Sequence, residues 1–399
     1  MSKIKIQGNS SGTGVLTLEA PNTATDRTIT LPDSTGTLLD TTSGLDATKL
    51  SGTLPALNGA SLTGIAGRKN MIINGAMNVA QRGTQSLSSD AYTACDRFSY
   101  DITGSYAATY NTTQDSSGTD GFSNSLKFDV TTADTPATDE FGRILYRIEA
   151  QDLQHLKYGT SSAQSITLSF WVKSNKTATY AISIYVSDGT RIIGSTYTIS
   201  SADTWEYKTV TFAGDTAGTI DNNNDTGMQF SFVLDSGSNW TSADNSSWGA
   251  YSAGKNAYGH TATVGRSTSD YFQITGVQLE LGSTATDFEH RSYGEELALC
   301  QRYYEAISGG LGVGIVKSST AADCAFQPKV TKRAAPTISF SGTLYANDGS
   351  AQQGASLSST VVTKDGLIVI VGFSSLNEGR ACTLYTASVS DKLIVDAEL

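Results

Sequence analysis

The stretch Ile166-Thr-Leu-Ser-Phe-Trp-Val172 decides the fold class of this chain, because an apolar residue stands at every second position from Ile166 to Val172. The segments 180–186 and 228–234 alternate in the same way. A period of two places one face of a strand in a core and the other face in solvent. Ser187-Asp-Gly189 follows the second segment directly and predicts a hairpin turn. These residues therefore predict antiparallel β-structure.

Alternating segments of this kind recur from residue 68 to residue 292. We count roughly eight of them over this length, which favours a β-sandwich with jelly-roll topology. In the segment 272–281 the apolar positions change from even to odd at Gly276. A glycine at such a change of phase predicts a β-bulge. The main domain is therefore predicted to be a jelly roll over residues 68–292.

A short helical connector is predicted after the sandwich, over residues 293–306. Leu297, Cys300 and Tyr304 recur there at helical spacing, and two glutamates open the run. Acidic residues in a first turn suit the helix dipole.

Residues 307–399 are predicted to form a C-terminal β-domain, which would be the tip of an elongated molecule. Strands are indicated at 337–340, 366–371 and 393–395. The continuous apolar run at 367–371 is typical of a strand that is covered on both faces. The fold class predicted for the whole chain is mainly β, with a single substantial helix.

The first 67 residues contain no aromatic residue, although the chain has 13 Phe, 18 Tyr and 4 Trp. Aromatic rings supply much of the apolar surface of globular cores. In the run from Leu45 to Ile65, leucines recur between glycines and prolines, which disfavour a helix. One such strand cannot cover its own leucines, whereas three copies wound together could. We therefore predict a trimeric shaft over residues 1–67, with a disordered linker as the alternative.

The charge of the chain argues against a nucleic-acid partner. The formal net charge is −11, only 16% of the residues are charged, and no basic stripe is visible. Binding to a phosphate backbone needs clustered Lys and Arg. No apolar run has the length of a signal peptide or of a transmembrane helix, so no membrane insertion is expected. The four cysteines are far apart and are predicted to be buried free thiols.

Motifs of enzyme active sites are missing from the sequence. The three histidines are isolated, and neither a GxSxG elbow nor a P-loop occurs. Aspartates and glutamates are scattered in turn segments, so the sequence selects no carboxylate pair of the kind that glycosidases use. The chain is therefore expected not to be an enzyme.

One weak metal candidate is the alternating set Asp221, Asn223 and Asp225, which resembles the opening of an EF-hand loop. The glycine of that motif comes one place late, at Gly227, and Phe232 stands where the closing glutamate would be. A solvated turn is the better interpretation. We expect no cofactor, with a structural Ca²⁺ as the alternative.

The best candidate for ligand binding is the long loop 236–270, which contains Trp240, Trp248, Tyr251 and Tyr258 among Ser, Asn and Gly. Sugars stack their apolar C–H faces on aromatic rings, and small polar side chains bond their hydroxyls. Amphipathic aromatic residues beside small polar ones make recognition surfaces at low entropic cost. The alternative is that these rings hold the loop against the sandwich or against a neighbouring subunit.

Two stretches of the sequence, 70–83 (Asn-Met-Ile-Ile-Asn-Gly-Ala-Met-Asn-Val-Ala-Gln-Arg-Gly) and 277–304, resemble segments of tail-fibre and other receptor-binding appendage proteins of tailed phages, marine cyanobacterial phages among them. The N-terminal segment 16–41 is similar to repeats in such fibres. The ending Ile394-Val-Asp-Ala-Glu-Leu399 is similar to their endings.

The resemblance implies a homotrimeric virion protein. The N-terminus would attach to other virion proteins, and a jelly roll like that of carbohydrate-binding modules would recognise a glycan on the host surface. Such a protein would be part of the virion, at the tail or the head, and would be extracellular after lysis. Two alternatives are a purely structural head fibre or tail adaptor, whose partners are other virion proteins, and a glycan-degrading tailspike. The resemblance transfers no individual binding residue.

Overall fold

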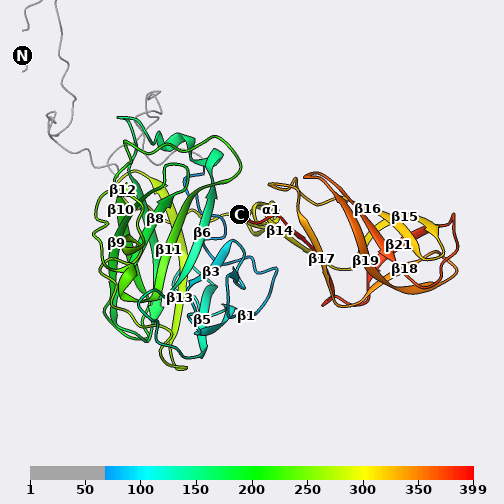
Figure 1. The fold of residues 1–399 in the computed structure, drawn as a ribbon, viewed down its shortest axis with the longest axis horizontal. Coiled ribbons are helices and arrows are strands. Elements are labelled where there is room, and N and C mark those ends of the chain that lie inside the picture. Colours follow the sequence, from blue (N-terminus) through cyan, green and yellow to red (C-terminus); the bar gives the residue numbers. More distant parts are fainter. Residues whose placement is uncertain (1–67) are drawn as a thin grey trace, which may run out of the picture. The chain divides into compact units, whose positions relative to one another are not determined.

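The computed structural model describes residues 68–399, drawn in colour in Figure 1. The predicted shaft over residues 1–67 lies outside the described residues. The described chain is mainly β, as predicted, and it combines a two-sheet sandwich with a C-terminal barrel.

The sandwich consists of two antiparallel sheets (Figure 1). In spatial order, the first sheet contains β1 (Gln85–Leu87), β4 (Thr109–Asp115), β5 (Ser125–Thr132), β13 (Tyr271–Leu281), β7 (Ile166–Ser174) and β10 (Glu206–Phe212). The second sheet contains β12 (Gly249–Ala250), β9 (Arg191–Ile199), β8 (Ala178–Val186), β11 (Thr226–Ser236), β6 (Phe141–Glu149), β3 (Phe98–Thr103) and β2 (Ala91–Tyr92).

Eight of these strands have the connectivity of a jelly roll. The order β5-β13-β7-β10 in one sheet faces the order β6-β11-β8-β9 in the other, and the chain changes sheet at almost every step from β5 to β13. This arrangement is two interlocked Greek keys. The predicted jelly roll is therefore confirmed, and the short or outlying strands β1 to β4 and β12 extend its two sheets.

The core of the sandwich is made by the alternating positions of the sequence. Leu168, Phe170 and Val172 on β7 are fully buried. The ring of Phe170 meets that of Phe232 on β11 edge to face, with 5.2 Å between the centroids. Burying one such side chain stabilises the fold by about 1.5–3 kcal/mol. The residues between them, such as Ser169, lie on the outer face of the first sheet.

Two local predictions in the sandwich are confirmed. The chain turns between β8 and β9, where the amide of Thr190 donates to the carbonyl of Ser187 at 3.1 Å. The register of β13 against β7 shifts between Thr275 and Gln278, as a bulge requires. Gly276 lies at this shift with a φ of 61°, a conformation that side chains other than glycine rarely adopt.

The two segments that carry the phage-fibre resemblance are neighbours in the fold. The side-chain nitrogen Nδ2 of Asn70 donates to the backbone carbonyl of Val277 at 3.2 Å, and its side-chain oxygen accepts from the backbone amide of Leu279 at 3.0 Å. A Cβ at Gly75 would lie 2.0 Å from the Val277 carbonyl oxygen, so only glycine fits this close approach. The start of the domain is therefore bonded directly to its last strand.

The predicted helix is present but shorter than expected. Helix α1 (Tyr293–Gln301) begins after Ser292, whose hydroxyl accepts from the amide of Glu295 at 3.3 Å. Tyr304 is not helical, so the prediction was wrong there. The chain instead begins β14 (Tyr304–Ile307) at this residue, because its backbone pairs with Asp396. The predicted domain boundaries after residues 292 and 306 stay a prediction.

The C-terminal part contains a small sheet and a closed barrel. The sheet has the order β14, β22 (Lys392–Asp396) and β17 (Thr337–Ser341). The barrel is closed in the order β15 (Gly310–Ser318), β16 (Ala321–Phe326), β20 (Leu367–Gly372), β19 (Gln352–Val362), β18 (Leu344–Asn347) and β21 (Ala381–Thr386).

The prediction that the run 367–371 is covered on both faces was wrong. Val369 and Val371 are buried, whereas Ile368 is 40% exposed. A barrel strand has one face in the interior and one face outside, so its apolar run need not be buried at every position. All four cysteines are buried free thiols, as predicted.

Buried ion pairs join the end of the chain to the sandwich. The Glu398 carboxylate pairs with the guanidinium of Arg97, and with that of Arg82 at 3.1 Å. The Arg97 guanidinium also lies 3.4 Å from the centroid of the Tyr303 ring. Removing one partner of a buried pair is strongly destabilising, because the other charge is left without compensation. The last residues are therefore part of the folded unit.

Candidate functional site

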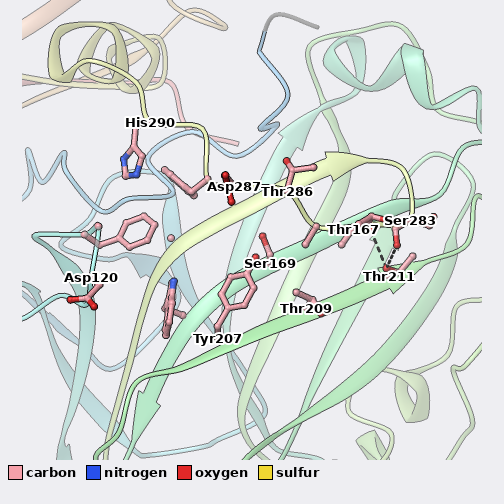
Figure 2. Close-up of a pocket in the computed structure, with 17 residues that line it drawn as sticks. Asp120, Thr167, Ser169, Tyr207, Thr209, Thr211, Ser283, Thr286, Asp287 and His290 are labelled. Carbon is pink, nitrogen blue, oxygen red and sulfur yellow. Dashed lines mark hydrogen bonds between the residues drawn. The ribbon is translucent and has the colours of Figure 1, made fainter. Parts of the chain in front are cut away.

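A large hollow lies on the outer face of the first sheet (Figure 2). Its volume is about 690 Å³. Strands β7 and β10 form its floor, the bulge of β13 borders it, and the loops 120–122 and 283–290 enclose it. We call this hollow the sheet-face groove.

Two aromatic rings form one part of the groove floor. Trp171 on β7 and Tyr207 on β10 are direct cross-strand partners. Their ring centroids are 5.3 Å apart, and the ring planes meet at 48°. Tyr207 is 46% exposed and Trp171 is partly exposed. Because both residues stand at outward positions of their strands, their rings face solvent and not the core.

Small hydroxyl side chains continue the floor along the same two strands. Ser169 faces Thr209, and Thr167 faces Thr211. Figure 2 shows these four residues side by side along the two strands, beyond Tyr207. The hydroxyls of Thr167 and Thr211 are 3.0 Å apart, and the Thr211 hydroxyl donates to the carbonyl of Ser283 at 3.3 Å. These bonds hold the loop after β13 beside the sheet.

A cluster of three rings forms the opposite wall. The Phe122 and Phe288 rings meet at 4.9 Å, and His290 lies 4.9 Å from Phe288. Gly276 lies against the Phe122 ring of this wall, and a Cβ at this position would be only 2.7 Å from the ring. The β-bulge therefore creates the space that the Phe122 ring occupies.

The electrostatic character of the groove is acidic. Asp120 and Asp287 line it, and none of the described lining residues is Lys or Arg. Behind the loop, the buried Glu280 carboxylate accepts from the amide of Thr286 at 2.8 Å and from its hydroxyl at 2.6 Å. The Lys69 ammonium also bonds the Thr286 hydroxyl, at 2.5 Å. The Lys69 ammonium and the Glu280 carboxylate therefore both contact the Thr286 hydroxyl.

Two of the four aromatic residues predicted for ligand binding line a second hollow. This edge hollow, of about 550 Å³, lies where β9 and β10 approach each other, and it contains Trp248, Tyr258 and Thr211. The indole N–H of Trp248 donates to the carbonyl of Ala213 at 2.6 Å, which fixes the ring. Tyr258 is 41% exposed.

The other two predicted residues lie elsewhere. Trp240 stacks on Phe141, with 4.8 Å between the centroids and 13° between the planes. Tyr251 is 41% exposed and meets the Tyr185 ring at 5.0 Å. Neither lines the groove or the edge hollow, so the structure does not bring the four rings together.

Sequence reasoning missed Trp171 and Tyr207. A signal was present, because Trp171 stands at a polar position of the alternating stretch 166–172. An aromatic residue at an outward strand position is a candidate for contact with a ligand. The pairing with Tyr207 could not be predicted, because it depends on the register between β7 and β10.

The weak metal candidate forms a turn. The amide of Asp225 donates to the side-chain oxygen of Asn223 at 3.0 Å, and the amide of Asp221 donates to the Asp188 carboxylate at 2.9 Å. Within residues 68–399, no group of three or more His, Cys, Asp or Glu is placed to hold a metal ion. Binding of Ca²⁺ stays an untested alternative. No helix in this part of the chain is long and apolar enough to cross a membrane.

No protein-family model matches the sequence, and no curated protein matches it significantly. Several solved structures are similar to about half of the chain. The enzymatically active domain of bacteriophage CBA120 tailspike protein 4 is 12% identical with a TM-score of 0.27, and the match covers 53% of this chain and 21% of that one. A putative sugar binding protein from Bacteroides thetaiotaomicron is 11% identical with a TM-score of 0.29, covering 53% and 100%.

A family 11 carbohydrate-binding module of a Clostridium thermocellum cellulosomal cellulase is 15% identical with a TM-score of 0.26, covering 51% of this chain and 98% of the module. TM-scores and identities this low carry no conclusion about the function of this chain. The function of this chain is therefore inferred from its own groove.

Proposed function

We propose that the sheet-face groove binds a neutral glycan. The observation that supports this most directly is the cross-strand pair Trp171 and Tyr207, which has exposed ring surface beside the exposed residues Thr209 and Thr211 of β10. A pyranose ring has an apolar face that stacks on aromatic rings, and hydroxyls at its edge that bond Ser and Thr. Binding sites combine apolar contact surface with a few placed polar groups in this way.

The charges in the groove favour neutral sugars over acidic ones. Asp120 and Asp287 would repel a carboxylate or sulfate on the ligand, and no Lys or Arg among the described lining residues would offset this repulsion. Repulsion of the wrong ligand is a common source of specificity. We therefore expect uronic-acid polymers to bind more weakly than neutral ones.

We further propose that the chain is a homotrimeric fibre protein of a tailed phage that recognises a glycan on the host surface. The sequence resemblance of residues 70–83 and 277–304 supports this proposal. Weak binding at each site would suffice, since a millimolar dissociation constant is about 4 kcal/mol and several linked sites raise the apparent affinity by orders of magnitude. A purely structural head fibre or tail adaptor is the alternative, and a glycan-degrading tailspike is less favoured.

Affinity electrophoresis of the full chain tests glycan binding. Native gels would contain mixed-linked β-glucan, xylan, mannan or galactan, with polygalacturonate as the acidic comparison. At least one neutral polymer should retard the wild type. Tyr207→Ala should weaken that interaction about tenfold, whereas Tyr251→Ala, a similarly exposed tyrosine outside the groove, should not. If no polymer retards the protein, the structural alternative is favoured.

Two further measurements test the finer proposal. Light scattering of the full chain should give the mass of a trimer, and a monodisperse monomer would contradict the predicted shaft. The protein would also be incubated with the polymer that retards it in the gel. Release of reducing sugar from this polymer, abolished by Asp120→Asn or Asp287→Asn, would contradict a non-catalytic role.

A further inference from the structure

The sheet-face groove and the edge hollow share one residue. Thr211, near the end of β10, lines both of them. Strand β10 is the last strand of the first sheet, so no further strand of that sheet separates the outer face from the side of the sandwich. In Figure 2, Thr211 lies at the end of the groove that is remote from Asp120 and His290.

The groove has the length of a ligand with several sugar units. The floor from Trp171 to Thr167 covers five residues of β7, and the four steps between them span about 13 Å at the usual rise of a strand. A ligand that stacks on Trp171 and follows the hydroxyls reaches Thr211, the cross-strand partner of Thr167. Thr211 also lines the edge hollow, whose aromatic residues are Trp248 and Tyr258.

The edge hollow has the same chemical character as the groove floor. Trp248 and Tyr258 supply ring surface, and Ser195 and Ser246 supply hydroxyls. None of the described residues that line the hollow is charged. Because the bond from the Trp248 indole to Ala213 already holds that ring in place, little side-chain entropy would be lost when a ligand binds.

We propose that the ligand is a linear oligosaccharide or polysaccharide, which runs along the groove, crosses β10 at Thr211 and ends against Trp248 and Tyr258. This inference rests on the proposed glycan binding, and it adds a second subsite and a minimum ligand length. A terminal mono- or disaccharide would occupy the groove alone. A longer chain would contact both regions and would bind more tightly through the added contacts.

Titration calorimetry with matched fragments tests this path. The full chain would be titrated with the disaccharide and the hexasaccharide of each neutral polymer named above. The hexasaccharide of the polymer that binds should bind at least tenfold more tightly than its disaccharide. Tyr258→Ala should remove most of this gain and leave the disaccharide affinity unchanged, whereas Tyr207→Ala should weaken both fragments.

Tyr251→Ala is the matched control, since Tyr251 belongs to the same loop and has the same exposed fraction as Tyr258. It should change neither affinity. Equal affinities of the two fragments for the wild type would overturn the path, and so would a Tyr258→Ala variant that keeps the full gain. Loss of disaccharide affinity in Tyr258→Ala would also overturn it. If neither fragment of any polymer binds the wild type, the proposed glycan binding itself fails.

Discussion

The sheet-face groove and the loop 236–270 both combine aromatic rings with small polar residues, but Trp240 and Tyr251 of the loop line neither the groove nor the edge hollow. In the groove, Trp171 and Tyr207 contact each other and leave ring surface exposed. In the loop, Trp240 stacks on Phe141 and Tyr251 meets Tyr185. Similar composition therefore supports two roles. What separates Trp240 from the groove pair is that its ring lies flat on Phe141 and packs against a buried cluster, whereas Trp171 and Tyr207 line the groove.

Trp240→Ala should produce the largest effect on this comparison. Trp240 packs on a buried cluster of Phe141, Ala181, Val233 and Ala257. Its loss should lower the free energy of unfolding by about 3 kcal/mol, because the cluster would lose its cover. Denaturant unfolding measures this change. Glycan affinity of the folded variant should be unchanged, and a selective loss of affinity would assign Trp240 to recognition instead.

The same loop should become less stable in acid through His260. Burial lowers the pKa of this imidazole from 6.5 to about 4, and its Nδ1 accepts from the amide of Ala181 at 3.2 Å. The fold therefore favours the neutral form. The contribution of neutral His260 to the free energy of unfolding is fully present above pH 6.5. As the pH falls toward 4, the free energy of unfolding decreases by up to about 3 kcal/mol.

Unfolding of the wild type and of His260→Asn at several pH values measures this loss. The variant should show a smaller decrease in stability between pH 6.5 and 4, because it lacks the group that takes up the proton. Identical pH profiles would show that the decrease arises elsewhere.

Gly276→Ala should affect the groove side of the comparison. The φ of 61° is unfavourable for alanine, and the added Cβ would lie 2.7 Å from the Phe122 ring. We expect a loss of about 2 kcal/mol in the free energy of unfolding together with weaker glycan binding, because the ring wall must shift. Gly282→Ala is a control that also has a positive φ but has no atom within 4 Å of the new Cβ. It should lose stability without losing affinity.

Tyr207→Phe should give the smallest effect. If the exposed ring face is what binds, removal of the hydroxyl should weaken binding by threefold or less, the worth of a hydrogen bond of about 0.5 kcal/mol. Titration calorimetry with the hexasaccharide of the polymer that binds the wild type measures this change in affinity. A tenfold loss would show that the phenolic hydroxyl, and not the ring, makes the decisive contact.

Local patterns predicted much of the fold, whereas contacts between distant residues could not be predicted. Alternation revealed β7, β8 and β11, and the change of phase revealed the bulge at Gly276, because both signals lie within one segment. The start of β14 at Tyr304 depends on pairing with Asp396, which is remote in sequence. The candidate site was missed for the same reason, since Trp171 and Tyr207 meet only through strand register.

The position of β10 has a consequence for the protein without ligand. The four outer strands of the sandwich are β1, β2, β10 and β12, and among them only β10 is longer than three residues. An unpaired edge of this length is a template for pairing with another chain, which promotes aggregation. Charged side chains oppose such pairing, and β10 carries Glu206 and Lys208, whose charged groups are 2.6 Å apart. A glycan that crosses this strand would shield the same edge, so preparations with bound ligand should stay dispersed at higher protein concentration.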